Sequence, residues 1–115
     1  MDIVSAYQEA DDLLKEMESL IDEMRRDGCQ LAEDENEYRR LRALRTVEYR
    51  ERHGYPVTIM RDVVSGLDDV RTARTQRDMD EVIYKADYEA LLVKKLHYRT
   101  LQEQISREYG KPSNQ

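Results

Sequence analysis

The sequence contains few of the residues that interrupt helices or fill large cores. Among its 115 residues there are four Gly, two Pro, no Trp and no Phe. So few Gly and Pro residues allow only a few turns, which argues against a compact globule built from many short elements. Cys29 is the only cysteine, so no intramolecular disulfide bond can form, and this fits a reducing compartment.

Long apolar runs are missing as well. No segment approaches the roughly 20 apolar residues of a membrane-spanning helix. The acidic N-terminus, MDIVSAYQEADD, lacks the apolar centre of a secretory signal. We therefore expect a cytoplasmic protein that does not bind membranes.

Charged residues make up 38% of the chain and apolar residues 39%, a composition typical of long helices that share a narrow seam. In the first arm, apolar residues alternate at spacings of four and three, the heptad pattern of a coiled coil: Ile3, Tyr7, Ala10, Leu14, Met17, Ile21 and Met24. The sequence therefore predicts an all-α protein, a long antiparallel helical hairpin that resembles a coiled coil and has a short helix at its bend.

Gly and Pro set the expected boundaries within a single helical domain of residues 1–110. The first arm covers residues 1–53, with a possible break near Gly28, because a glycine inside a helix costs about 1 kcal/mol relative to alanine. Gly54 is expected to end this arm in the left-handed conformation, and Pro56 prevents the helix from continuing.

Beyond the bend, Thr58 is the expected N-cap of a short helix over residues 58–65. A long helix follows over residues 67–109, and the polar tail 111–115 is expected to fray. The apolar stripe of the long helix is wider than one partner helix needs: Val70, Ala73, Met79, Val82, Ile83, Ala86, Ala90, Val93, Leu96, His97, Leu101 and Ile105. The excess favours a homo-oligomer, a dimer or a larger bundle, unless the N-terminal arm folds back to cover it.

Acidic and basic residues are unevenly distributed. Residues 1–38 carry thirteen acids and three bases, residues 39–77 carry five acids and ten Arg, and residues 78–115 carry seven acids and six bases. The basic middle can attract a phosphate-bearing ligand or an acidic partner, or it can neutralise acids of the same chain or of another copy. The acidic arm can occupy a basic groove on a partner, or serve solubility alone.

No motif indicates an enzyme. His53, His97 and Cys29 lack the spacing of a metal site, and neither a Gly-x-Ser-x-Gly turn nor a Gly-rich phosphate loop occurs. The acidic segments EMESLIDEM and EDENEYRR are similar to the paired carboxylates of all-helical nucleotide pyrophosphatases, but the last helix offers only a weak matching set. We expect no catalysis, no metal and no cofactor.

The candidate ligand site is the bend. Tyr offers a flat face there, and Arg offers bidentate contacts to phosphate. In a hairpin the elements at the bend converge, which predicts a basic ligand site at Arg45, Tyr49, Arg52, Tyr55, Thr58, Arg61, Arg71, Arg74 and Arg77. The same face can instead be a seam between subunits, and the apolar residues of the short helix can plug the end of the bundle.

Residues 54–110, from GYPVTIMRDVVSGLDDVR through IYKADYEALL to ISREYG, resemble the C-terminal half of small, all-helical accessory proteins of tailed phages and prophages. The matching features are the Pro-Val-Thr start, the short helix that ends in Gly, the Arg and Asp residues that open the long helix, and the Tyr-Lys-Ala phrase. The resemblance implies no defined activity and assigns no functional residues. A phage context implies antagonism of host defence or an accessory role in replication or recombination.

We therefore predict a non-catalytic binding protein, a phage counter-defence factor that inhibits a host nuclease or immune protein or sequesters a nucleotide signal. The expected partners are further copies of the chain and either a host protein or a phosphorylated small ligand. One alternative is a structural coiled-coil scaffold. The other is nucleic-acid binding, against which the net charge of −6 counts, through Arg39, Arg40, Arg42, Arg45, Arg71, Arg74 and Arg77.

Overall fold

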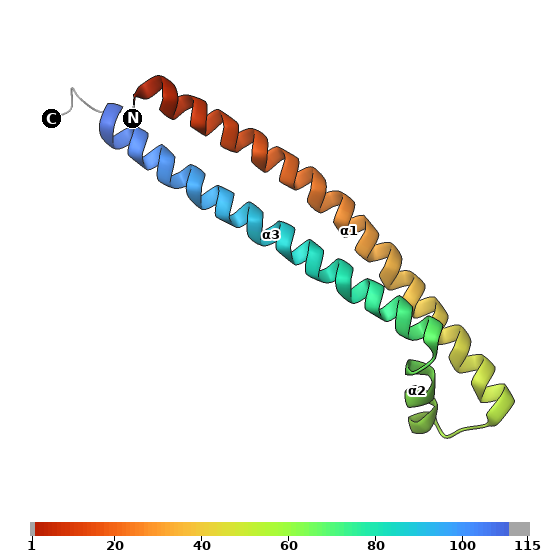
Figure 1. Ribbon diagram of the computed structural model, residues 1–115. Helices are drawn as coiled ribbons and strands as arrows, with labels where there is room; N and C mark the ends of the chain where they lie inside the picture. Colours follow the sequence, from red (N-terminus) through yellow and green to blue (C-terminus); the bar gives the residue numbers. More distant parts are fainter. Residues whose placement is uncertain (1, 111–115) are drawn as a thin grey trace. The chain divides into compact units, whose positions relative to one another are not determined.

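The computed structural model describes residues 2–110, which form three α-helices and, within that range, no β-strand (Figure 1). α1 spans Ile3–His53, α2 spans Val57–Ser65 and α3 spans Asp68–Tyr109. The all-α class predicted from the sequence is therefore confirmed. The tail 111–115, which was predicted to fray, lies outside the described residues.

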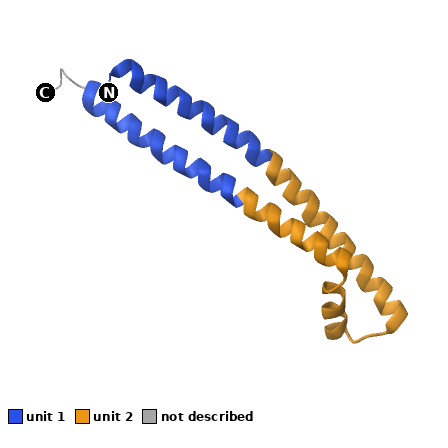
Figure 2. Cartoon of the chain, in the orientation of Figure 1, with its two compact units in different colours: residues 1–25, 85–115 blue, residues 26–84 orange. Residues whose placement is uncertain are grey.

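The chain divides into two compact units (Figure 2). Unit 1 contains residues 1–25 and 85–115, and unit 2 contains residues 26–84. Within each unit a segment of α1 packs beside an antiparallel segment of α3, as shown by the pairs Glu9 with His97, Glu16 with Lys94, Glu35 with Arg77 and Arg45 with Asp69. The predicted single hairpin and the predicted oligomer stay predictions.

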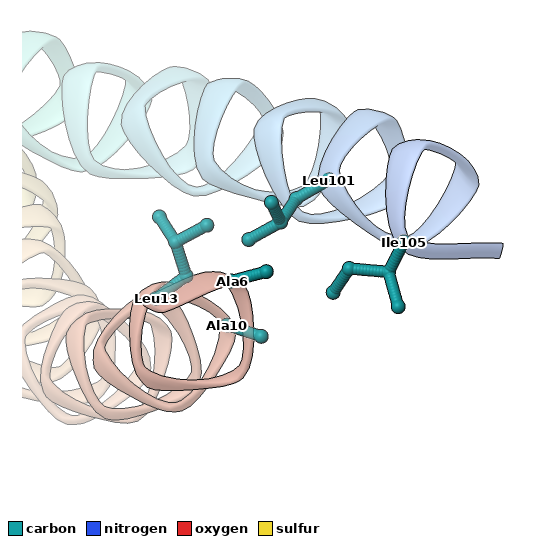
Figure 3. Packing of buried hydrophobic residues seen from close by; sticks show 5 residues of the cluster. All are labelled: Ala6, Ala10, Leu13, Leu101 and Ile105. Atoms are coloured by element: carbon teal, nitrogen blue, oxygen red, sulfur yellow. The ribbon is translucent and has the colours of Figure 1, made fainter. Parts of the chain in front are cut away.

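In unit 1, the core lies between the first turns of α1 and the last turns of α3 (Figure 3). Its buried side chains are Ala6, Ala10 and Leu13 from α1 and Leu101 and Ile105 from α3. Small side chains on α1 therefore face large ones on α3, which lets the two backbones lie close together.

The buried stripe of α1 differs from the predicted one. Tyr7 and Leu14 were expected in the seam, yet they are 56% and 41% exposed, while the preceding Ala6 and Leu13 are buried. Both stripes have heptad spacing and share Ala10, so spacing alone could not separate them. Close packing against α3 favours the stripe that contains the small side chain of Ala6.

Part of the predicted stripe of α3 does not face α1 over the middle of the helix. Val82, Val93 and Leu96 are 68%, 64% and 59% exposed, and the expectation that another copy covers this excess stays a prediction. Polar residues such as Arg77 and Lys94 lie against α1 instead and form ion pairs with its glutamates. Partners across the seam offset the cost of partly burying these charges, so pairing and not hydrophobicity alone decides which face turns toward α1.

The core of unit 2 joins all three helices. Tyr38 from α1, Met60 and Val64 from α2 and Val70 from α3 are all buried and in one cluster. The other apolar side of α2 stays outside this core, since Val57 is 67% exposed. The short helix therefore packs against the other two helices through a single side.

The ends of the helices at the bend are set by Gly and Pro. Gly54 has a φ of 64°, and its N–H donates to the carbonyl of Arg50 at 2.9 Å, as expected for a left-handed cap. The prediction of Thr58 as N-cap is wrong. Pro56 occupies that position without a side-chain hydrogen bond, and Thr58 lies in the first turn of α2. Near the middle of α1, the helix continues through Gly28 without a break.

We expect Gly54→Ala to lower the free energy of unfolding by about 1 to 2 kcal/mol, because a Cβ is disfavoured in the left-handed region. Chemical denaturation followed by circular dichroism measures this change. Gly66→Ala is the matched control, since Gly66 has a φ of −88° and a Cβ there would meet no atom closer than 3.6 Å. Equal losses in the two variants would contradict the assigned role of Gly54.

Candidate functional site

A pocket of about 620 Å³ lies between the C-terminal part of α1 and α2. Apolar side chains of α2, including Met60 and Val64, form much of its wall. Three arginines and three hydroxyl groups supply its polar atoms. The residues that line this pocket, called the α1–α2 pocket below, are Arg42, Ala43, Thr46, Arg50, Tyr55, Val57, Met60, Arg61, Val64 and Ser65.

Helical spacing places the α1 residues of the pocket. Arg42, Thr46 and Arg50 are four residues apart, so they lie on one face of α1. The Thr46 hydroxyl donates to the carbonyl of Arg42 at 2.7 Å, which fixes the threonine side chain against its own helix. The two guanidinium groups are the main groups that this face of α1 can offer to a ligand.

Within the described part of the chain, the arginines of the pocket have no carboxylate partners. Arg50 and Arg61 form no ion pair within residues 2–110, and no acidic side chain lines the pocket. Among the described residues, the Arg42 guanidinium contacts Tyr38, whose ring centroid lies 5.1 Å from the guanidinium carbon and whose hydroxyl lies 3.4 Å from Nη1. The pocket therefore has a positive potential inside a chain with a net charge of −6.

Two of the nine predicted site residues, Tyr55 and Arg61, line the α1–α2 pocket, and Thr58 does not. Arg45, Tyr49 and Arg52 line a separate pocket of about 350 Å³, together with Glu48, Leu67, Asp68 and Asp69. The predicted residues are thus divided between two places in unit 2.

Arg45 is held by acids of its own unit. Its Nη2 lies 2.7 Å from Asp69 Oδ2 and its Nη1 lies 2.6 Å from Glu48 Oε2. The hydrogen bonds that Arg45 donates to Asp69 and, second, to Glu48 raise the pKa of Arg45, and Arg45 in turn lowers the pKa of Asp69. This residue therefore joins α1 to α3 and is occupied without a ligand.

The arginines of α3 do not line the α1–α2 pocket. Arg77 Nη1 lies 3.0 Å from Glu35 Oε2, and its guanidinium carbon lies 4.7 Å from the ring centroid of Tyr38. Arg71 pairs with Asp68 at 3.1 Å. Arg71 and Arg77 pair with neighbouring acids, and Arg74 does not line the α1–α2 pocket. The assignment of these three arginines to a ligand site stays a prediction.

Sequence reasoning did not assign Arg42, Thr46, Arg50 and Ser65 to the site. The i, i+4 spacing of Arg42, Thr46 and Arg50 was the available signal. Which face of α1 turns toward α2 depends on the burial of Tyr38 and Met60, and that is a tertiary contact.

Comparisons with protein-family models, with curated proteins and with solved structures find no match to this chain. The phage resemblance therefore stays a prediction. None of the helices within residues 2–110 has the length and apolar character needed to cross a membrane.

Three aromatic rings lie against one another near the end of α1, with one pair stacked and the other tilted at 40°. The centroids of His53 and Tyr55 are 5.1 Å apart with an interplanar angle of 21°, and those of Tyr49 and His53 are 5.3 Å apart. Tyr55 is 39% exposed. Its ring is held by this stack and is available to a planar ligand group.

A second polar cluster lies in the seam of unit 2. Asp80 is 5% exposed, and its Oδ1 accepts a hydrogen bond from Gln76 at 3.0 Å, while its Oδ2 has no donor among the described residues. The neighbouring Asp34 raises the pKa of Asp80, and burial and Asp27 act in the same direction. A hydrogen bond from Asp80 lowers the pKa of Asp34, to which Gln30 also donates. A proton on Asp80 Oδ2 therefore satisfies both carboxyl groups.

We expect Asp80→Asn to raise the free energy of unfolding at pH 7 by about 1 kcal/mol, because the amide supplies the missing donor and removes a buried charge. Since folding raises the pKa of Asp80, its stabilising contribution is present at low pH and is lost as the pH rises through the raised pKa. The variant should therefore lose less stability than the wild type between acidic and neutral pH in urea denaturation.

Asp62→Asn, on the exposed surface of α2, is the control and should change the stability by less than about 0.5 kcal/mol. A loss of stability in Asp80→Asn at pH 7 would show that the charged form of Asp80 is favourable in the native state.

Proposed function

We propose that this protein is a non-catalytic binding protein whose α1–α2 pocket holds a phosphorylated small ligand with an apolar or planar part. The observation that carries the proposal is the set of three arginines without carboxylate partners above an apolar wall. A charged group with no internal partner is available to a ligand of opposite charge.

The chemistry of the pocket suits the two parts of such a ligand. Arg42, Arg50 and Arg61 can each donate two hydrogen bonds to phosphate oxygens. Val57, which is 67% exposed, and the ring of Tyr55 can pack against a base or another planar group. The volume of about 620 Å³ lies within the roughly 300 to 1,000 Å³ that small-molecule sites occupy.

The composition of the pocket supports binding over turnover. The residues that line it include no carboxylate, imidazole or thiol, which are the usual general bases and activated nucleophiles. Its hydroxyl groups, such as that of Ser65, have no base beside them within the lining. We propose that the ligand is held and released unchanged.

The pocket and the phage resemblance together support one use of this protein. In that use, a phage counter-defence factor sequesters a nucleotide signal. Inhibition of a host nuclease or immune protein by the acidic arm is a separate possibility. For that role the support is the excess of ten acids over bases within residues 1–38.

Nucleic-acid binding along the predicted row of arginines has less support. Five of its seven members form ion pairs with acids of the chain, which reduces the charge that they can offer to phosphates: Arg39 with Glu35, Arg40 with Glu37, Arg45 with Asp69, Arg71 with Asp68 and Arg77 with Glu35. A scaffold without a ligand would leave the unpaired arginines of the pocket unexplained.

We propose as well that the protein works as an oligomer. Large apolar side chains of both long helices are exposed, among them Leu14, Ile21 and Leu92 at 41%, 37% and 40%. Such exposed apolar surface is a common property of subunits that associate.

We expect Arg50→Ala combined with Arg61→Ala to weaken binding of a phosphorylated ligand by about tenfold to a hundredfold, since hydrogen bonds between charged groups are worth about 1.5 to 3 kcal/mol. Isothermal titration calorimetry with ATP, a cyclic dinucleotide and inorganic pyrophosphate measures the affinities. ATP or the cyclic dinucleotide should bind more tightly than pyrophosphate, because only they can use the apolar wall.

Arg52→Ala is the matched control, because Arg52 lies on the same helix but lines the other pocket. It should leave the affinity within about twofold of the wild type. Equal losses in the control and the double variant would place the ligand outside the α1–α2 pocket. Absence of binding by all three probes would count against a phosphorylated ligand of these classes.

A further inference from the structure

Polar contacts lie along one side of the seam between α1 and α3 in unit 1. Glu9 of α1 and His97 of α3 each come one residue before a residue of the seam, and Glu9 Oε1 lies 3.3 Å from His97 Nε2. On the same side, Glu16 Oε2 lies 2.8 Å from Lys94 Nζ. These contacts also fix the level at which the two antiparallel segments lie beside each other.

The opposite side of the seam is apolar and open. Each heptad has two buried positions. In an antiparallel pair of helices, the residues that come directly after the second of these positions lie on the same side of the seam in both helices. On α3 these positions hold Tyr88, Lys95 and Gln102. The apolar residues at these positions, together with the residue one turn beyond Tyr88, are called the apolar face of unit 1, and on α3 this face gives way to polar residues from Lys95 onward. Its members are 37% to 56% exposed: Tyr7, Leu14 and Ile21 on α1, and Tyr88 and Leu92 on α3.

Opposite charges border the two edges of this face. On the α1 edge, Asp11 and Glu18 follow Tyr7 and Leu14 by one helical turn, and Arg25, which pairs with Asp22 of its own helix, follows Ile21. Lys95 and Arg99 border the α3 edge. Glu18, Lys95 and Arg99 form no ion pair within residues 2–110. Asp11 pairs only with the exposed Lys15 of its own helix.

We propose that the apolar face of unit 1 binds the same face of a second copy, with α1 of each copy lying over α3 of the other. A two-fold axis parallel to the helices produces this arrangement and places the acidic edge of each copy on the basic edge of its partner. A two-fold axis across the helices would place α1 on α1, and acids would then face acids. The charge pattern therefore selects the first arrangement.

The contacts inside unit 1 fix which charges meet. Glu9 pairs with His97 and Glu16 pairs with Lys94, so Asp11, which lies between the two glutamates, is level with the turn from Lys95 to Arg99 on α3. In the proposed dimer each copy keeps its level along the axis. Asp11 of one copy therefore reaches Lys95 of the other, and the symmetry repeats the pair.

Charge also favours a second copy over an unrelated helix. The α1 part of unit 1, residues 1–25, carries eight acids and two bases, while the described α3 part, residues 85–110, carries five bases and four acids. One unit thus supplies both halves of the complementary pattern. The proposal rests on the proposed oligomer and is independent of the ligand pocket in unit 2.

Sedimentation velocity on the full chain at micromolar concentration tests the proposal. The wild type should have twice the mass of the 13.7 kDa chain. Leu14→Glu combined with Leu92→Glu should raise the dimer dissociation constant by about a hundredfold, because two charges per copy enter an apolar contact. Circular dichroism should show unchanged helix content.

Charge reversal tests the arrangement. Asp11→Lys and Lys95→Glu should each raise the dissociation constant by about tenfold, and their combination should return it to within about threefold of the wild type. If these residues acted only on the folding of one chain, the double variant would not regain its affinity. Failure of the combination to restore binding would overturn the crossed arrangement.

Val93→Glu combined with Leu96→Glu is the matched control, since these side chains are at least as exposed but lie away from the apolar face of unit 1. This variant should stay dimeric. A monomeric wild type would contradict the proposed oligomer itself. A dimer that persists in Leu14→Glu with Leu92→Glu but dissociates in the control would place the interface elsewhere on α3.

Discussion

The burial of one side of α2 is the contact on which the candidate site depends. Met60 and Val64 pack with Tyr38 of α1 and Val70 of α3. A helix of nine residues has little stability by itself in water, so α2 keeps its helical form only while this contact persists. The same residues form the apolar wall of the α1–α2 pocket. Folding of unit 2 and formation of the pocket are therefore the same event.

The arginines of unit 2 belong to two groups with different physical roles. Arg45 and Arg77 cross from one long helix to the other and end on acids, so their charge is used to hold α1 and α3 together. Arg50 and Arg61 form no ion pair with an acid within the described residues. Formal charge counts the two groups alike, and only the positions of the neighbouring carboxylates distinguish a structural arginine from one that is available to a ligand.

Much of the fold could be predicted because its signals are local. Gly54 and Pro56 mark the bend through backbone geometry alone, and the long charged segments between punctuation residues indicate helices. The face that each helix buries could not be predicted in the same way. Ala6 and Tyr7 both belong to stripes with heptad spacing, and the choice between them depends on how closely α3 approaches.

The site shows the same division between local and tertiary information. The sequence indicated a basic bend that includes Tyr55 and Arg61, and these two residues line the α1–α2 pocket. Arg45 carries the same charge and was expected to act with them, but its acids come from α3 and from the next turn of α1. No count of bases along a chain contains that information, because a salt bridge between distant residues exists only after folding.

The separation of charge within this chain affects how the rate of anion capture depends on ionic strength. An anionic ligand far from the molecule is repelled by the net charge of −6, and only near the pocket does it meet the field of three cations. Dissolved salt screens charges beyond about 8 Å under physiological conditions. Moderate salt therefore removes the distant repulsion while it leaves the close attraction, and concentrated salt weakens both. Capture of an anion by this pocket should be fastest at an intermediate ionic strength, unlike capture by a uniformly basic protein, which slows steadily as salt is added.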